Sequence, residues 1–270
     1  MKTRAITGFF FVVVMLASLL LGKQAFATFF IILSLLCLVE FYKLVRSESI
    51  RPHRSMGVLL AGTLIAPLAL SFIFDDSYLK YLFLAVPAAI LICIVELFRN
   101  RAHPFVNLAF TYFGILFTIV PFCFFTALAF IGNSFNFHFP LAFMLMLWAS
   151  DTGAYIFGVN FGKHKLFERH SPKKSWEGFF GGLATSLLAA YIISTQFEEL
   201  AFGEWAIMSV IIVIAGTFGD LFESMLKRSI DIKDSGSLLP GHGGLLDRFD
   251  GLLFAAPLVF LYLYGILILA

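Results

Sequence analysis

Long apolar runs, each bounded by a short polar stretch, follow one another along the chain of 270 residues. A helix needs about 20 mostly apolar residues to cross the hydrocarbon core of a bilayer. Runs that meet or approach this length predict an all-α integral membrane protein with nine transmembrane helices. The predicted spans are 5–21, 25–45, 56–74, 78–98, 105–131, 139–157, 179–193, 206–225 and 252–269.

The composition excludes most other classes of protein. Hydrophobic residues make up 60% of the chain and charged residues only 13%, whereas a soluble domain carries about 25% charge. This balance excludes an ordinary soluble globule, a disordered chain and a disulfide-rich secreted domain. The basic residues are scattered between apolar runs instead of forming one basic face, so we predict no nucleic-acid partner.

The distribution of basic residues predicts the orientation. If the polar segments alternate between the two sides of the membrane, the side with the N-terminus holds 17 of the 19 Lys and Arg residues. The other side holds only Lys23 and Lys80. Because basic residues accumulate in cytoplasmic loops, we expect a cytoplasmic N-terminus and an external C-terminus. The first span is long for a secretory signal, and the second span begins almost at once, so we expect it to be retained.

The two halves of the chain differ in where polar residues occur. Residues 1–138 are expected to form an apolar transmembrane scaffold, in which Glu40 and Glu96 near the ends of spans are interpreted as interfacial charges. Residues 139–270 interrupt their apolar runs with Asp151 and Asp220. Charged groups at membrane depth are costly and usually face a cavity or a partner. The second half is therefore expected to be catalytic, although a structural hydrogen bond remains an alternative for each aspartate.

The segment between the last two predicted spans combines glycines, carboxylates and bases. Gly241, Gly243 and Gly244 follow Pro240, and glycines let backbone N–H groups approach an anion closely. Carboxylates bind hard cations, and basic side chains neutralise phosphate charge. The segment therefore predicts a metal–nucleotide phosphate site. The charged residues of this segment that would form the site include Lys227, Arg228, Lys233, Asp247, Arg248 and Asp250. Glu223, just before the segment, shares a helix face with Asp220 and Lys227.

A second basic segment precedes the seventh predicted span. Lys173 and Lys174 lie next to Ser175, a plausible N-cap, and a helix N-terminus beside two lysines favours an anion. The alternative is that these lysines only determine topology. Gly178 and Gly182 are four residues apart, which favours close helix packing.

These motifs resemble those of the phosphatidate cytidylyltransferases, also called CDP-diglyceride synthases, of the prokaryotic type. The resemblance covers the second half of the chain and is most specific between Ser224 and Asp250. Its residues are Ser150–Tyr155, Ser171–Gly178, Ser224, Lys227, Arg228, Lys233, Asp234, Gly236, Pro240–Gly244, Asp247, Arg248 and Asp250.

The resemblance implies an enzyme that converts CTP and phosphatidic acid from the bilayer into CDP-diacylglycerol and pyrophosphate. It implies a requirement for Mg²⁺ and leaves open whether a second cation binds. The implied metal ligands are Asp220, Asp247 and Asp250, and Lys227 and Arg228 are implied as further catalytic residues. It also implies a homodimer in the bacterial inner membrane with its site facing the cytoplasm. The expected substrate-binding residues are Asp151, Ser171, Lys173, Lys174, Ser175, Glu177, Ser224, Lys233, Asp234, Gly241, His242, Gly243, Gly244 and Arg248.

Two other functions remain as alternatives. A CTP-dependent lipid kinase of the dolichol or phytol kinase type would transfer the γ-phosphoryl group to an alcohol and would require a general base. An ion-coupled transporter would use Asp151 and Asp220 as ion ligands, but no internal repeat of the kind found in transporters is visible in the sequence.

Overall fold

The computed structural model describes residues 2–132, 134–232, 235–236 and 243–269, with side chains from residue 8 onward. The chain forms two compact units, and it enters each of them twice. Unit 1 comprises Met1–Ala127 and Asp234–Leu246, and unit 2 comprises Leu128–Lys233 and Asp247–Ala270. The segment before the last helix thus belongs to unit 1, although the helices on both sides of it belong mainly to unit 2.

Unit 1 consists of helices. Phenylalanine rings fill part of its core, where Phe26, Phe30 and Phe125 lie with neighbouring ring centroids 4.8–6.3 Å apart. The elements are α1 (Lys2–Leu20), α2 (Lys23–Leu44), α3 (Arg54–Ile73), the 3₁₀ segment Asp76–Leu84 leading into α4 (Ala85–Phe98), α5 (Pro104–Gly114), the π-helical turn Ile115–Ile119 and α6 (Val120–Leu128).

The interpretation of Glu40 and Glu96 as interfacial charges was wrong, because each is only 3% exposed. The Glu96 carboxylate accepts a hydrogen bond from Asn107 Nδ2 at 2.8 Å and lies 2.5 Å from His53 Nε2 and 3.4 Å from Arg99 Nη1. A buried charge is tolerated when it is paired and hydrogen-bonded. Glu96 therefore joins α3, α4 and α5 within unit 1.

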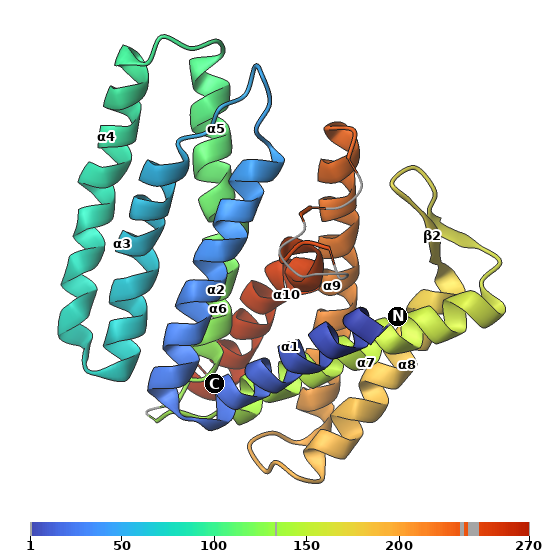
Figure 1. Cartoon of the computed structure of the whole chain (residues 1–270). Coiled ribbons are helices and arrows are strands. Elements are labelled where there is room, and N and C mark those ends of the chain that lie inside the picture. The colour runs from blue at the N-terminus through green and yellow to red at the C-terminus, as the bar shows by residue number, and fades with distance from the viewer. Residues whose placement is uncertain (1, 133, 233–234, 237–242, 270) are drawn as a thin grey trace. The chain divides into compact units, whose positions relative to one another are not determined.

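Unit 2 contains α7 (His138–Phe161), α8 (Trp176–Ser194), α9 (Phe202–Ser229) and α10 (Leu246–Tyr264), which ends in the π-helical turn Gly265–Leu269. Between α7 and α8 the chain forms an antiparallel hairpin of β1 (Lys165–Phe167) and β2 (Ser171–Ser175), visible at the end of these helices in Figure 1. The sequence did not predict this short hairpin, whose strand β2 carries Lys173 and Lys174; otherwise the fold is helical, as expected for an all-α membrane protein.

Glycines bring α7 and α8 close together, as the spacing of Gly178 and Gly182 predicted. A Cβ on Gly178 would lie 2.8 Å from the Ala154 carbonyl oxygen, and one on Gly182 would lie 2.8 Å from that of Ser150. The start of α8 is also as predicted, because the Ser175 hydroxyl accepts a hydrogen bond from the Gly178 N–H at 3.1 Å.

Among the described residues, eight helical segments are long and apolar enough to cross a membrane. They correspond to the second to ninth predicted spans. In α1 the described apolar helix, Gly8–Leu20, is shorter than a full crossing, so the ninth span stays a prediction. The last helix begins at Leu246, six residues before its predicted start. The prediction began too late because it followed apolar residues only, and the helix begins with a stretch that contains Asp247, Arg248 and Asp250.

Candidate active site

A cavity of about 420 Å³ in unit 2 collects most of the charged residues that the sequence singled out. Its walls come from α7, β2, the first turns of α8, the middle of α9 and the start of α10. The predicted site residues that line it are Asp151, Lys173, Lys174, Ser175, Asp220, Asp247, Arg248 and Asp250. Residues as far apart in the sequence as Asp151 and Asp250 thus bring acidic and basic side chains to the same cavity.

The Asp220 carboxylate lies in an ion pair with a predicted phosphate-binding lysine. Its Oδ2 is 2.5 Å from Nζ of Lys174, and its Oδ1 accepts a hydrogen bond from the Ser224 hydroxyl at 3.3 Å. Asp220 is 38% exposed on its side chain, toward the cavity. The charge of Asp220 within α9 is therefore compensated, and it remains accessible to a ligand.

Lys227 lies between two carboxylates. Its Nζ donates to Glu223 Oε2 at 2.8 Å and to Asp247 Oδ1 at 2.6 Å, so one ammonium joins α9 to α10. Glu223 is fully buried, and its Oε1 has no hydrogen-bond partner among the described residues. Glu223 was not among the predicted site residues, although its spacing of four from Lys227 could have suggested this pair.

Asp151 and Asp250 add negative charge to the same cavity. The carboxylate of Asp250 is repelled by Asp220, Glu223 and Asp151. Asp151 is also repelled by Asp220 and is attracted by Lys174 and Arg248. The Asp250 Oδ1 accepts a hydrogen bond from the Gly251 N–H at 2.7 Å. Several carboxylates are thus held near one another, an arrangement that a bound cation would stabilise.

Close packing of α9 on α10 determines where Asp250 lies. A Cβ on Gly219 would be 2.3 Å from the backbone oxygen of Asp250. Real side chains cannot approach a backbone so closely, so only glycine fits at this position of α9 without moving α10.

We therefore expect Gly219→Ala to lower both the thermal stability and the activity of the purified protein. Overpacking costs about 1–3 kcal/mol. Gly203→Ala on the same helix is the matched control, since a Cβ there meets nothing within 4 Å, and it should leave both properties unchanged. Thermal unfolding in detergent checks this, and equal melting temperatures for the two variants would contradict the packing argument.

Other predicted site residues lie outside the cavity lining. Glu177 accepts hydrogen bonds from the His164 N–H at 3.2 Å and so closes the base of the hairpin. Arg228 is at the end of α9, where its Nη1 donates to the Ile232 carbonyl at 3.2 Å. Ser171 is in β2, and Gly243 and Gly244 belong to unit 1. Lys233, Asp234, Gly241 and His242 lie outside the described residues.

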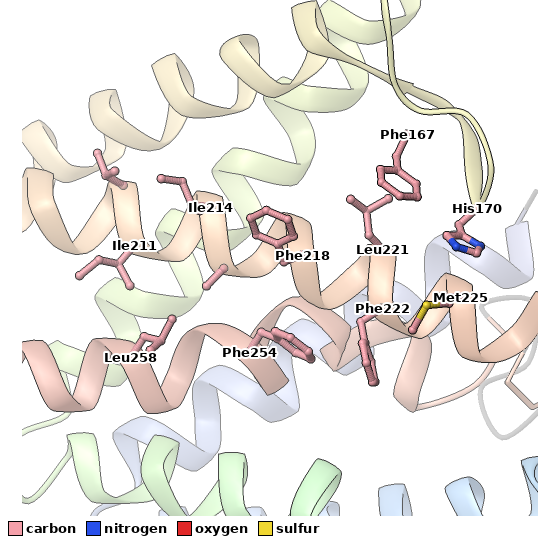
Figure 2. Close-up of a pocket in the computed structure, with 12 residues that line it drawn as sticks. Phe167, His170, Ile211, Ile214, Phe218, Leu221, Phe222, Met225, Phe254 and Leu258 are labelled. Atoms are coloured by element: carbon pink, nitrogen blue, oxygen red, sulfur yellow. The ribbon is translucent and has the colours of Figure 1, made fainter.

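A larger cavity of about 670 Å³ in unit 2 has a different chemical character. Figure 2 shows side chains of α9 and α10, with Phe167 and His170 of the hairpin at one end. His170 is the only residue of this lining with an ionisable side chain. This cavity suits hydrocarbon, and the smaller cavity is the one suited to phosphates.

The carboxylates of the polar cavity fit a Mg²⁺ ion of the kind that nucleotide enzymes use. Among the described residues, no group of three or more acidic, His or Cys side chains forms a ready-made metal cage. Mg²⁺ usually binds one or two carboxylates together with water and substrate phosphates. Asp220, Asp247 and Asp250 offer such oxygen ligands beside three bases that could hold the phosphates.

Comparison with known proteins shows the family to which this chain belongs. The sequence profile of the cytidylyltransferase family matches residues 2–266. A phosphatidate cytidylyltransferase of Staphylococcus haemolyticus is 34% identical over 96% of this chain and 97% of its own length. Phosphatidate cytidylyltransferases of Staphylococcus saprophyticus and Staphylococcus aureus are 36% and 34% identical over the same shares. The chain belongs to the cytidylyltransferase family.

Proposed function

We propose that this protein is a phosphatidate cytidylyltransferase that transfers CMP from CTP to phosphatidic acid, forming CDP-diacylglycerol and pyrophosphate. The observation that carries the proposal is the polar cavity of unit 2, in which Asp220, Asp247 and Asp250 lie beside Lys173, Lys174 and Arg248. The nearly full-length likeness to proteins of that name supports the same activity.

The residues of the cavity suit a reaction between two polyanions. An oxygen of the lipid phosphate attacks the α-phosphorus of CTP, a new P–O bond forms, and the bond to the pyrophosphate oxygen breaks. The second pKa of a phosphate monoester is about 6, so the attacking oxygen is already largely ionised at neutral pH. No strong general base is therefore needed. Lys173, Lys174 and Arg248 would hold phosphate groups and reduce their mutual repulsion.

Asp220, Asp247 and Asp250, which all line the cavity, would hold Mg²⁺. Whether a second cation binds is left open. When bound, the ion supplies charge neutralisation at the phosphates and orients the α-phosphorus. In the structure the ammonium group of Lys174 neutralises the charge of Asp220, and that of Lys227 neutralises the charge of Asp247. Binding of the nucleotide phosphates to Lys174 would release Asp220 for the metal.

The distribution of label tests the reaction. Purified protein, phosphatidic acid, Mg²⁺ and CTP labelled at the α-phosphate should yield labelled lipid, whereas label in the γ-phosphate should appear in pyrophosphate. Transfer of the γ-label to lipid would instead identify a lipid kinase. The lipid fraction and the released pyrophosphate are measured in the same samples.

We further propose that the site faces the cytoplasm of a bacterial inner membrane, with the C-terminus outside, and that the protein is a homodimer. The partition of 17 basic residues against two supports this orientation. The mass of the purified particle in detergent tests the dimer.

Cysteine accessibility in intact cells tests the orientation. Lys173→Cys should resist a reagent that does not cross membranes, while Lys80→Cys, in a predicted external segment, should react. Both side chains belong to the described part of the chain, and Lys173 is exposed. Labelling of position 173 from outside would contradict both the orientation and the cytoplasmic site.

A further inference from the structure

One carboxylate of α2 binds both ends of the segment that precedes α10. Glu40 is 3% exposed, and it accepts three hydrogen bonds from residues about 200 positions later in the chain. Its Oε1 receives the Ser235 hydroxyl at 2.7 Å and the Leu246 N–H at 3.1 Å, and its Oε2 receives the Leu245 N–H at 2.9 Å. All four residues belong to unit 1.

Two glycines of the motif make room for this carboxylate. A Cβ on Gly244 would lie 2.1 Å from Glu40 Oε1, and a Cβ on Gly236 would lie 3.1 Å from Glu40 Cδ. Gly243 has a φ of 82°, a conformation that favours glycine. The sequence predicted Gly244, but not Gly236, as a substrate-binding residue; in the structure both glycines lie against an anion of the protein itself.

We propose that Glu40 is a positioning residue for the cytidylyltransferase reaction: it holds Ser235 and Leu245–Leu246 together and thereby fixes the start of α10. Leu246 is the first residue of α10, and Asp247 and Arg248 follow it directly. The bond from the Leu246 N–H therefore fixes the backbone one residue before the carboxylate that pairs with Lys227. This inference rests on the proposed function.

The hydrogen-bond pattern distinguishes Glu40 from an ordinary buried charge. All three groups that it binds are donors, and only a carboxylate can accept from them at both of its oxygens. Glu40→Gln keeps the shape of the side chain but replaces one carboxylate oxygen by an NH₂ group, which is a donor. In one orientation this NH₂ faces the Leu245 N–H, and in the other it faces the Ser235 hydroxyl and the Leu246 N–H. The substitution thus removes the function of the carboxylate while leaving its volume.

Glu96 offers a matched control. It is equally buried in unit 1, but its partners His53, Arg99 and Asn107 all lie between residues 53 and 107. Glu96→Gln should lower the melting temperature and leave the specific activity of the folded protein unchanged. If both substitutions acted only through general stability, the two variants would behave alike.

The test compares purified wild-type protein, Glu40→Gln and Glu96→Gln in lipid nanodiscs. For Glu40→Gln we expect kcat to fall by about tenfold or more, since a hydrogen bond to a buried charge is lost. The KM for phosphatidic acid should stay within about twofold, because the interaction serves the arrangement of catalytic groups and not lipid binding. Hydrogen exchange at residues 245 and 246 should accelerate in Glu40→Gln and remain at the wild-type rate in Glu96→Gln.

A second pair of variants approaches the same contact from the other side. Gly244→Ala should reproduce the loss of kcat, because the added methyl group would overlap both the Ser235 hydroxyl and the Glu40 carboxylate and so would break their contact. Gly62→Ala in α3 is its control, since a Cβ there meets nothing within 4 Å. Because these variants keep the Glu40 carboxylate, a loss of activity in Gly244→Ala would come from the disturbed contact and not from removal of the charge.

The outcomes are distinguishable. Wild-type turnover in Glu40→Gln, or unchanged exchange at residues 245 and 246, would overturn the positioning role. Equal loss of specific activity in Glu40→Gln and Glu96→Gln would overturn it as well. If the wild-type protein itself formed no CDP-diacylglycerol, the proposed function would fail and the catalytic role with it, while the exchange data would still decide whether Glu40 holds the segment.

Discussion

Asp220→Asn and Asp247→Asn are each expected to give folded, membrane-inserted protein with almost no cytidylyltransferase activity. The substitution keeps the shape of the side chain and removes one negative charge. A carboxylate that serves to hold Mg²⁺ contributes little to the stability of the metal-free protein. Catalysis should collapse, because charge neutralisation at the reacting phosphates is lost.

The structure refines this expectation for each aspartate. The side chain of Asp220 is 38% exposed, so loss of its pair with Lys174 should hardly change the melting temperature. Asp247 is 12% exposed and pairs with Lys227, so Asp247→Asn should lower stability more. The double variant should be little less active than either single variant, since the two carboxylates would act as a unit.

Activity measured against Mg²⁺ concentration, and melting temperature on the same preparations, check this prediction. Residual activity should require more Mg²⁺ than the wild type does. Asp220 could instead be a structural partner of Lys174 and Ser224. In that case Asp220→Asn would lower the melting temperature and leave the specific activity and the Mg²⁺ optimum of the surviving protein unchanged, which would refute the metal-binding assignment.

Lys227→Met is expected to lower turnover by more than about tenfold, because one charge-stabilising contact in a water-excluded site contributes about 3 kcal/mol. The substitution also leaves Glu223 and Asp247 without their shared ammonium. Removal of one partner of a buried ion pair costs about 3–5 kcal/mol, so the melting temperature should fall as well. Steady-state kinetics and thermal unfolding of the purified variant measure both effects.

A double variant separates these two effects. Lys227→Met with Glu223→Gln removes one positive and one negative charge, so stability should return toward the wild-type value. Activity should remain low if Lys227 serves the phosphates. Recovery of activity together with stability would show that Lys227 is only structural. Lys43→Ala, at an exposed position of α2 outside every motif, should be nearly silent.

Local patterns predicted the features that depend on neighbouring residues. The apolar runs predicted eight of the long helices, since helix formation in a membrane follows from composition and length. Ser175 predicted the start of α8 because an N-cap acts over three residues. Gly178 and Gly182 predicted close packing because small residues allow helix backbones to approach one another.

Features that join distant segments were less accessible. Nothing near Glu40 in the sequence indicates that its partners are Ser235, Leu245 and Leu246. Asp220 was recognised as a candidate ligand, but its pairing with Lys174 depends on how β2 lies against α9. The hairpin escaped prediction because the segment between α7 and α8 is short and polar and has no alternating apolar pattern.

The distance in sequence between Glu40 and its donors has a consequence for biosynthesis. Ser235 and Leu246 follow Glu40 by 195 and 206 positions, so they are synthesised long after it. During most of translation the Glu40 side chain therefore lacks these donors. Until the C-terminal part of the chain has been made, it must either lie near water or be protonated in the lipid. A chain truncated before Ser235 would lack all three of the hydrogen-bond donors that Glu40 has in the structure.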